Sequence, residues 1–277
     1  DPKGAAWAQA ISSGAFIWNL AVSPAAALVN ITQTYVLGVP VLGAHLGGVT
    51  RATAELSKAS TELLGSKALR LENRLKGDEK AAMHEFYRLG LVDRTQSHNL
   101  AGVGETGVEY SSIRAKWMGR LSFMFHHAER VNREVTALAA YRMARKQGQG
   151  HDAAIATAAE LTWLTHFDYS NSSRARYMQH DVAKVLAIHK QHSINMTYRL
   201  FRDLHQALKG ATAEERRIAR TQFVGVMGMH ALMAGVKGIP FYGVAMLAAG
   251  LLKDAFGDDD DDRTPEDLLK KWLYESG

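Results

Sequence analysis

Residues 117–150 read WMGRLSFMFHHAERVNREVTALAAYRMARKQGQG, and their apolar side chains recur at alternating spacings of three and four. This spacing places the side chains along one side of a helix, as a seam that a neighbouring element can cover. The glycines at 148 and 150 predict the end of that helix. We therefore expect a long amphipathic helix near the middle of the chain, with a seam of Leu121, Met124, Ala128, Val131, Val135 and Leu138.

The composition extends the helical expectation to the whole chain. Only 5 of the 277 residues are proline, 47% are hydrophobic, and strand-forming runs are nearly absent. Such a chain can bury a sizeable core and favours helix over strand. We predict an all-α protein, built as an elongated multi-helix array with apolar helical hairpins at both ends. Because it opens on Asp1-Pro2-Lys3 rather than Met, we expect it to be part of a longer polypeptide.

The first uncharged stretch runs from Gly4 to Thr50, without a single Asp, Glu, Lys or Arg. Pro24 and Pro40 are expected to break it into shorter helical pieces, because proline disrupts a helix interior. Two environments fit the stretch: a hairpin packed inside protein, or one that contacts a membrane. In either case we expect contacts to membrane or neighbouring subunits from Phe16, Ile17, Trp18, Leu28, Val36 and Leu37.

A second such stretch, Thr221 to Leu252, carries Lys237 as its only formal charge. Gly238-Ile239-Pro240 divides it into two arms that are each shorter than a membrane span. Small residues recur in both arms and let helix backbones approach closely in lipid or in protein. We predict a helical hairpin, with contacts to membrane or subunits from Met227, Met233, Phe241, Met246 and Leu251.

Four segments follow from these patterns: an apolar hairpin (1–50), a charged helical body (51–210), a second apolar hairpin (211–257), and an acidic linker with a terminal amphipathic helix (258–277). Gly77-Asp78 predicts a break in the helical pattern of residues 51–90. Thr212 and Glu215 form a predicted capping box at one helix start. Thr264-Pro265 predicts the start of the last helix. The preceding run of aspartates fits a solvated linker better than a calcium site, which needs spaced ligands and a turn glycine.

No grouping of nucleophile, base and orienting residue is visible, so we expect no enzyme activity and no catalytic residue. The absence of cysteine excludes disulfides, thiolate nucleophiles and Cys-based metal sites. His189 and His192 have metal-compatible spacing but lack a third ligand, and no metal is expected. The glycines from Gly102 to Gly107 match a dinucleotide fingerprint in letters only, because no βαβ unit surrounds them. No cofactor is expected.

The middle of the chain is its basic part, within a net charge of +5. Helices that carry many cations can line a channel and hold a polyanion by its backbone, without reading bases. A solvated basic surface is the alternative interpretation. The candidate DNA-facing residues are Arg130, Arg133, Arg142, Arg145, Arg174, Arg176, Lys184, Lys190, Arg199 and Arg202.

Three stretches, taken in order, resemble a known family: SPAAALVNITQTYVLGVPVLG at 23–43, FMFHHAERVNREVTALAAYRMAR at 123–145, and THFDYSNSSRARYM from 165 followed by VLAIHKQHSINMTYRLFRD at 185–203. They are similar to the helical region of the internal or ejection proteins of tailed phages and of related large polyvalent proteins. The resemblance covers most of the chain and carries over no catalytic residue.

The resemblance implies a non-enzymatic segment that is packed in the virion and then expelled into the host periplasm or inner membrane. There it would form a homo-oligomeric conduit for genome delivery, together with other virion core or ejection proteins. DNA, bound non-specifically, and the host inner membrane would be further partners. Two other interpretations stay open: a helical module that braces a virion enzyme such as a lytic transglycosylase or polymerase, and a colicin-like pore former.

Overall fold

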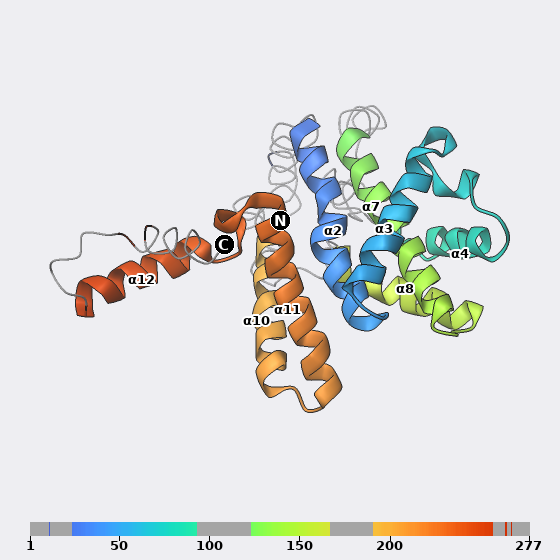
Figure 1. Ribbon diagram of the computed structural model, residues 1–277. Coiled ribbons are helices and arrows are strands. Elements are labelled where there is room, and N and C mark those ends of the chain that lie inside the picture. The colour runs from blue at the N-terminus through green and yellow to red at the C-terminus, as the bar shows by residue number, and fades with distance from the viewer. Residues whose placement is uncertain are drawn as a thin grey trace, which may run out of the picture. The chain divides into compact units, whose positions relative to one another are not determined.

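The computed structural model of the protein describes residues 11, 24–92, 123–166, 191–256, 264 and 267. Every regular element in these ranges is helical, which confirms the predicted all-α class (Figure 1). The chain divides into two compact units, Asp1–Gly225 and Val226–Gly277. The division falls inside α11 (Ala213–Ala234), and the four segments expected from the sequence stay a prediction.

The first unit is built around two helices, α2 (Pro24–His45) and α7 (Phe123–Lys146). Helix α7 packs on α2, α3 (Val49–Leu64), α4 (Gly77–Arg88) and α8 (His151–His166) (Figure 1). Helix α2 also packs on α3 and α8. Both helices therefore have neighbours on several sides.

The uncharged character of α2 follows from this position. The second half of α2 is covered by protein on all sides, so no side remains on which a charged side chain could reach water. The described part of the first uncharged stretch is thus packed inside the protein, while its hairpin form stays a prediction. The buried side chains are Thr34, Val36, Leu37, Val39, Val41, Leu42 and Ala44, followed by Leu46 just beyond the helix end.

Pro40 does not break α2, and the predicted break there was wrong. The helix continues from Pro24 to His45 with Pro40 inside it. An interior proline costs about 3 kcal/mol in helix stability. Full burial of a single Leu or Val side chain contributes roughly 1.5–3 kcal/mol, and several such side chains lie on either side of Pro40. Packing therefore outweighs the local penalty.

Turns connect α2 to α3 and α3 to α4. Gly47 and Gly48 have φ values of 99° and 107°, a region that favours glycine, and they turn the chain from α2 into α3. Two 3₁₀ turns, η2 (Lys67–Leu69) and η3 (Leu71–Asn73), lead to α4. Helix α4 begins at Gly77, where the Gly-Asp pair predicted a break in the helical pattern.

Helix α7 confirms the most definite prediction from the sequence, and it ends at Lys146, just before the glycines at 148 and 150. Its burial is wider than the predicted seam. Val135 and Leu138 are buried, as the spacing requires, but Val131 is only half-buried. Several polar side chains of α7 are buried as well, among them Arg133 and Glu134.

Helices α10 (Gln191–Lys209) and α11 (Ala213–Ala234) are joined by a short turn that starts at Gly210. The predicted capping box is present: Thr212 Oγ1 accepts from the Glu215 N–H at 3.0 Å, and Glu215 Oε2 accepts from the Thr212 N–H at 3.2 Å. Gly225 of α11 lies against Pro40, and a Cβ atom there would approach Pro40 Cβ to 2.8 Å.

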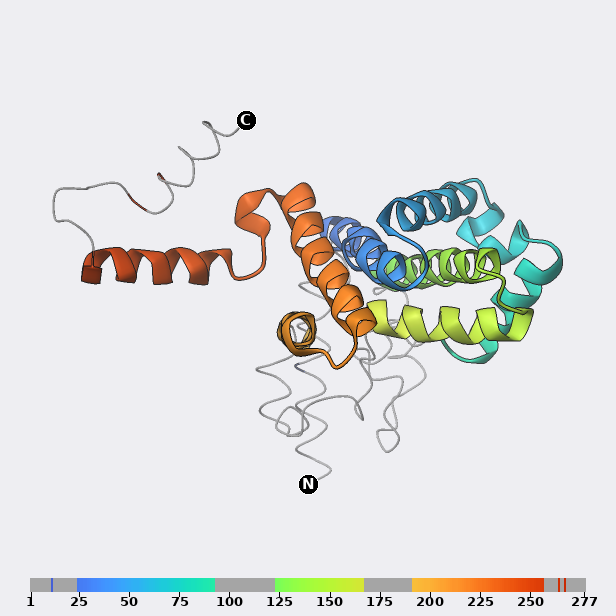
Figure 2. The same ribbon diagram turned by 60° about the horizontal axis from the view of Figure 1, so that its bottom comes forward.

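The second unit holds the end of α11, a 3₁₀ turn η6 (Val236–Gly238) and α12 (Tyr242–Phe256) (Figure 2). The predicted interruption around Gly238-Ile239-Pro240 is confirmed, while antiparallel packing of the two arms stays a prediction. The predicted start of the last helix also has support, because Thr264 Oγ1 accepts from the Asp267 N–H at 3.2 Å.

Candidate functional site

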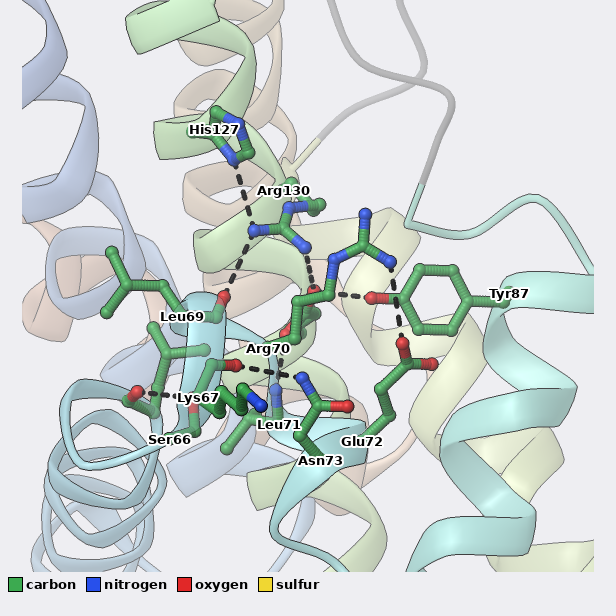
Figure 3. Close-up of polar contacts among 12 residues, drawn as sticks. Ser66, Lys67, Leu69, Arg70, Leu71, Glu72, Asn73, Tyr87, His127 and Arg130 are labelled. Atoms are coloured by element: carbon green, nitrogen blue, oxygen red, sulfur yellow. Dashed lines mark hydrogen bonds and ion pairs between the residues drawn. The ribbon is translucent and has the colours of Figure 1, made fainter.

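Charged side chains of α7 form a buried cluster with the segments that precede and include α4 (Figure 3). Glu134 has no exposed surface and lies 3.2 Å from Arg130 across one helical turn. Its carboxylate accepts from the Tyr87 hydroxyl at 2.5 Å and from the Leu71 N–H at 3.2 Å. Arg130 in turn donates to the Leu69 carbonyl at 3.0 Å. The cluster therefore ties η2, η3 and α4 to α7.

Burial sets the electrostatics of this cluster. Desolvation raises the pKa of Glu134 above its ordinary value, against the opposing effects of the Tyr87 hydrogen bond and the Arg130 charge. The pKa of Tyr87 is also raised, mainly by burial and then by the nearby Glu134 carboxylate. A phenol with a raised pKa stays protonated and keeps donating to Glu134. The arrangement is therefore a stable structural contact.

A second ion cluster joins α3, α4 and α7 through Arg142. Its guanidinium donates to Glu62 and to both carboxylate oxygens of Glu79, each at 2.8 Å. Desolvation lowers the pKa of Arg142, but its hydrogen bonds to Glu79 and Glu62 raise it overall. Arg142 thus stays charged and joins α7 to α3 and α4, which are both distant from α7 in the sequence.

Arg133 and His166 occupy the interior between α7 and α8. Arg133 donates to the Leu91 carbonyl at 3.2 Å, and its guanidinium carbon lies 5.0 Å from the centre of the Trp163 ring. His166 Nε2 lies 2.8 Å from Thr136 Oγ1. Complete burial holds the pKa of His166 well below its ordinary value, and the Arg133 charge adds to this effect.

Helix α10 is attached through Arg199, which is almost fully buried beside Asp203 at 3.5 Å. Arg199 donates to the Leu164 carbonyl at the end of α8 and, at 3.0 Å, to Gln222 Oε1 of α11. Desolvation lowers the pKa of Arg199 to about 10, against the nearby Asp203 carboxylate. The guanidinium therefore remains charged at neutral pH.

These contacts correct the prediction for four of the candidate DNA-facing residues. Arg130, Arg133, Arg142 and Arg199 expose 2–8% of their surface and hold protein carboxylates, carbonyls or an aromatic ring. A phosphate backbone has no access to them. Arg145 and Arg202 keep 40% and 36% of their side chains exposed, and each lies near an aspartate. The four others, Arg174, Arg176, Lys184 and Lys190, lie outside the described residues.

The predicted contact residues fall into three groups. Val36 and Leu37 are buried inside the first unit, so their predicted contacts with membrane or subunits were wrong. Met233 and Phe241 are exposed, and Met227 and Met246 are half-buried. Phe16, Ile17 and Trp18 lie outside the described residues, as do the side chains of Leu28 and Leu251.

Helix α10 carries an apolar surface that the sequence reasoning missed. We call it the α10 stripe: Tyr198, Phe201, Leu204 and Leu208, which are 69%, 60%, 37% and 69% exposed. Their spacing of three, three and four puts them along one side of the helix. A different side of α10 buries Met196, Leu200 and Ala207 in the protein. The spacing could have revealed the stripe, but the buried and the exposed apolar side chains adjoin in one broad apolar face of α10, so the sequence does not say which part of that face is covered.

The second unit exposes large apolar side chains as well. Leu232 and Met233, near the end of α11, are 76% and 48% exposed, and Val244 and Leu247 of α12 are each 65% exposed. No helix within 24–92, 123–166 and 191–256 is long and apolar enough to cross a membrane.

One polar hollow on the first unit is lined mainly by ions that already have partners. A hollow of about 240 Å³ between α3, α4 and α7 contains the pairs Lys146–Glu55, Arg142–Glu79 and Arg145–Asp78. Among the described residues, no three His, Asp or Glu side chains are grouped so that they could hold a metal ion.

Comparison with protein-family models, with curated proteins and with solved structures found no match for this chain.

Proposed function

We propose that this chain is a structural segment of a tailed-phage internal virion or ejection protein, which assembles with copies of itself into a conduit for genome delivery. It is packed in the virion and acts in the host periplasm or inner membrane, beside other virion core or ejection proteins. The proposal rests on the resemblance of its three sequence stretches to that family and on surfaces suited to assembly.

The observation that carries the assembly role is the α10 stripe. Monomeric soluble proteins rarely expose contiguous large apolar patches, and such patches commonly mark interaction sites. The stripe lies on a helix that Arg199 fixes to α8 and α11, so its side chains are presented on a rigid element. A rigid apolar helix side is a suitable contact for a second helix.

DNA contact, in this proposal, is limited to the exposed cations. Arg130, Arg133, Arg142 and Arg199 stabilise the helical bundle, so any channel lining would use exposed cations such as Arg145 and Arg202. Their contacts with Asp78 and Asp203 reduce the charge that they offer to a phosphate. Assembly, rather than DNA binding, is therefore the main role proposed for the described helices.

Light scattering of the purified chain, followed by electron cryo-microscopy, tests assembly. We expect masses that are multiples of the 30.4 kDa chain and particles with a central lumen. Phe201→Glu and Leu208→Glu should lower the mass, because each puts a charge into the proposed contact. Gln206→Glu adds the same charge at an exposed polar position of α10 and should leave the mass unchanged. A monomeric wild-type chain at high concentration, or equal effects of all three variants, would reject the proposal.

The membrane-active alternative draws on the second unit. Val244 and Leu247 are exposed on a helix from an otherwise nearly uncharged stretch, a pattern that suits insertion into the interface of a bilayer. Leakage of liposomes caused by the chain alone, and lost in Leu247→Asp, would favour this alternative. Intact liposomes at every protein concentration would count against it.

A further inference from the structure

The contact between α2 and α11 contains a hydrogen bond whose direction can be worked out. Gln222 Oε1 lies 3.0 Å from Arg199, and Gln222 Nε2 lies 2.9 Å from His45 Nε2. A guanidinium can only donate hydrogen bonds, so the Gln222 oxygen must face Arg199. The Gln222 NH₂ group, which also only donates, must then face His45.

It follows that His45 Nε2 has to accept, because two donors cannot bond to each other. An imidazole nitrogen accepts only when it carries no proton. His45 is therefore neutral in this arrangement, with its proton on Nδ1. A proton added to Nε2 would place an N–H group against the Gln222 N–H and remove the bond.

Gln222 cannot adapt by turning over. Rotation of its amide would restore the bond to a protonated His45, but it would point the NH₂ group at Arg199. Arg199 is 2% exposed, next to Asp203, and bonded to the Leu164 carbonyl, so it cannot move away easily. The contact of His166 with Thr136 differs, because a hydroxyl can either donate or accept.

The surroundings of His45 allow a proton from solvent to reach its ring. Its side chain is exposed to solvent at the end of α2, whereas Gln222 is buried. Partial desolvation lowers the pKa of His45 below its ordinary value. Of the charges that face the ring, Glu160 of α8 and Glu214 of α11 favour the proton, while Arg199 of α10 and Arg217 of α11 oppose it.

We propose that His45, Gln222 and Arg199 form a proton-sensitive latch, which holds α10 and the first part of α11 against α2 when His45 is neutral and loosens when His45 takes up a proton. The remaining polar contact at this place, from Arg217 to the Ala44 carbonyl at 3.1 Å, does not titrate near neutral pH and keeps the helices near each other. The latch does not depend on the proposed assembly role.

The direction of the pH effect follows from linkage. The pKa of His45 is lower in the latched state than in the open state, where it approaches about 6.5. The open state therefore binds more protons in mild acid, and the latch is favoured as pH rises. Its full strength is present above the open-state pKa and is lost as pH falls below that value.

Hydrogen exchange of the full chain at pH 5.5 and 7.5, corrected for the intrinsic pH dependence of exchange, tests the latch. In the wild type we expect amides of α10 and of α11 up to residue 225 to open about three- to tenfold more often at pH 5.5, as for the loss of one buried hydrogen bond. His45→Gln offers an amide oxygen near the place of Nε2 and should remove the acid effect in α10 and α11. Exchange in α7 and α8 should respond to pH equally in both proteins.

Gln222→Glu gives the opposite prediction and does not depend on the His45 variant folding. A carboxylate accepts both from Arg199 and from a protonated His45, so acid should now protect α11, and the pKa of His45 measured by NMR should rise. Equal acid effects in wild type and His45→Gln, or a His45 pKa that Gln222→Glu leaves unchanged, would overturn the proposal.

Discussion

Helices α2 and α12 come from the two nearly uncharged stretches of the chain, yet their described side chains have opposite surroundings. In α2, Leu37 and Leu42 have no exposed surface, while in α12 Val244 and Leu247 are each 65% exposed. Charged side chains also depart from the usual rule, because Arg133 and Glu134 are buried inside the first unit. The neighbours that a helix meets, rather than its own composition, decide which side chains are covered.

The largest expected effect is the loss of stability when a charge is introduced into α2 rather than into α12. Leu37→Asp would place an unpaired carboxylate in the core and should cost about 4 kcal/mol or more, enough to unfold a marginally stable protein. Leu247→Asp, at an exposed position of α12, should change the free energy of unfolding by less than about 1 kcal/mol. Chemical denaturation followed by circular dichroism measures both. Similar losses in the two variants would break the comparison.

A buried ion should behave like a core residue. Glu134→Leu removes the carboxylate and leaves Arg130 buried without it, which typically costs about 3–5 kcal/mol. Glu160→Leu on α8 is the matched control, because Glu160 is exposed, and it should cost less than about 0.5 kcal/mol. Denaturation midpoints of the two variants test the difference. If Glu134→Leu were as stable as the wild type, the cluster in Figure 3 would not hold the bundle together.

A smaller effect is expected where α11 approaches α2 at Pro40. In Gly225→Ala the new methyl group would meet Pro40 Cβ at 2.8 Å, so one helix must shift at a cost of about 1–3 kcal/mol. Gly228→Ala on the same helix meets nothing within 4 Å and should instead stabilise by up to about 1 kcal/mol. Thermal melting of both variants checks the prediction. A gain in stability for Gly225→Ala would mean that α11 does not lie against Pro40.

The smallest expected effect concerns two arginines of α7 that look equivalent in sequence. Arg145 is 40% exposed and lies 3.6 Å from Asp78, so Arg145→Gln should cost less than about 1 kcal/mol. Arg142→Gln, by contrast, leaves Glu62 and Glu79 without their shared partner and should cost clearly more in the same denaturation measurement. Equal costs would show that burial does not separate the two side chains.

Local patterns predicted the helices well because the interactions that create them are local. The seam of α7, the capping box of Thr212 and Glu215, and the break at Gly77 depend on residues a few positions apart. The prediction of a break at Pro40 was wrong because the helix is held by burial of the side chains before and after Pro40. That burial depends on α2 packing against α3, α7 and α8, which the local pattern does not include.

The candidate site was harder to predict for the same reason. Arg142 binds Glu62 and Glu79, which lie 80 and 63 residues away, and no spacing within α7 indicates either partner. A count of basic residues therefore placed buried arginines on a DNA-facing surface. The α10 stripe carries a readable spacing, but only the packing of the other side of α10 shows that the stripe is exposed.

Single cysteines give the most direct test of the contrast between α2 and α12, because the chain contains no cysteine of its own. We would introduce Leu42→Cys and Leu247→Cys separately and measure the rate of maleimide labelling under native conditions and in denaturant. We expect the thiol at 247 to react almost as fast in the native protein as in denaturant, and the thiol at 42 to react only as fast as the protein unfolds. Fast native labelling at 42, or protection at 247 equal to that at 42, would contradict it.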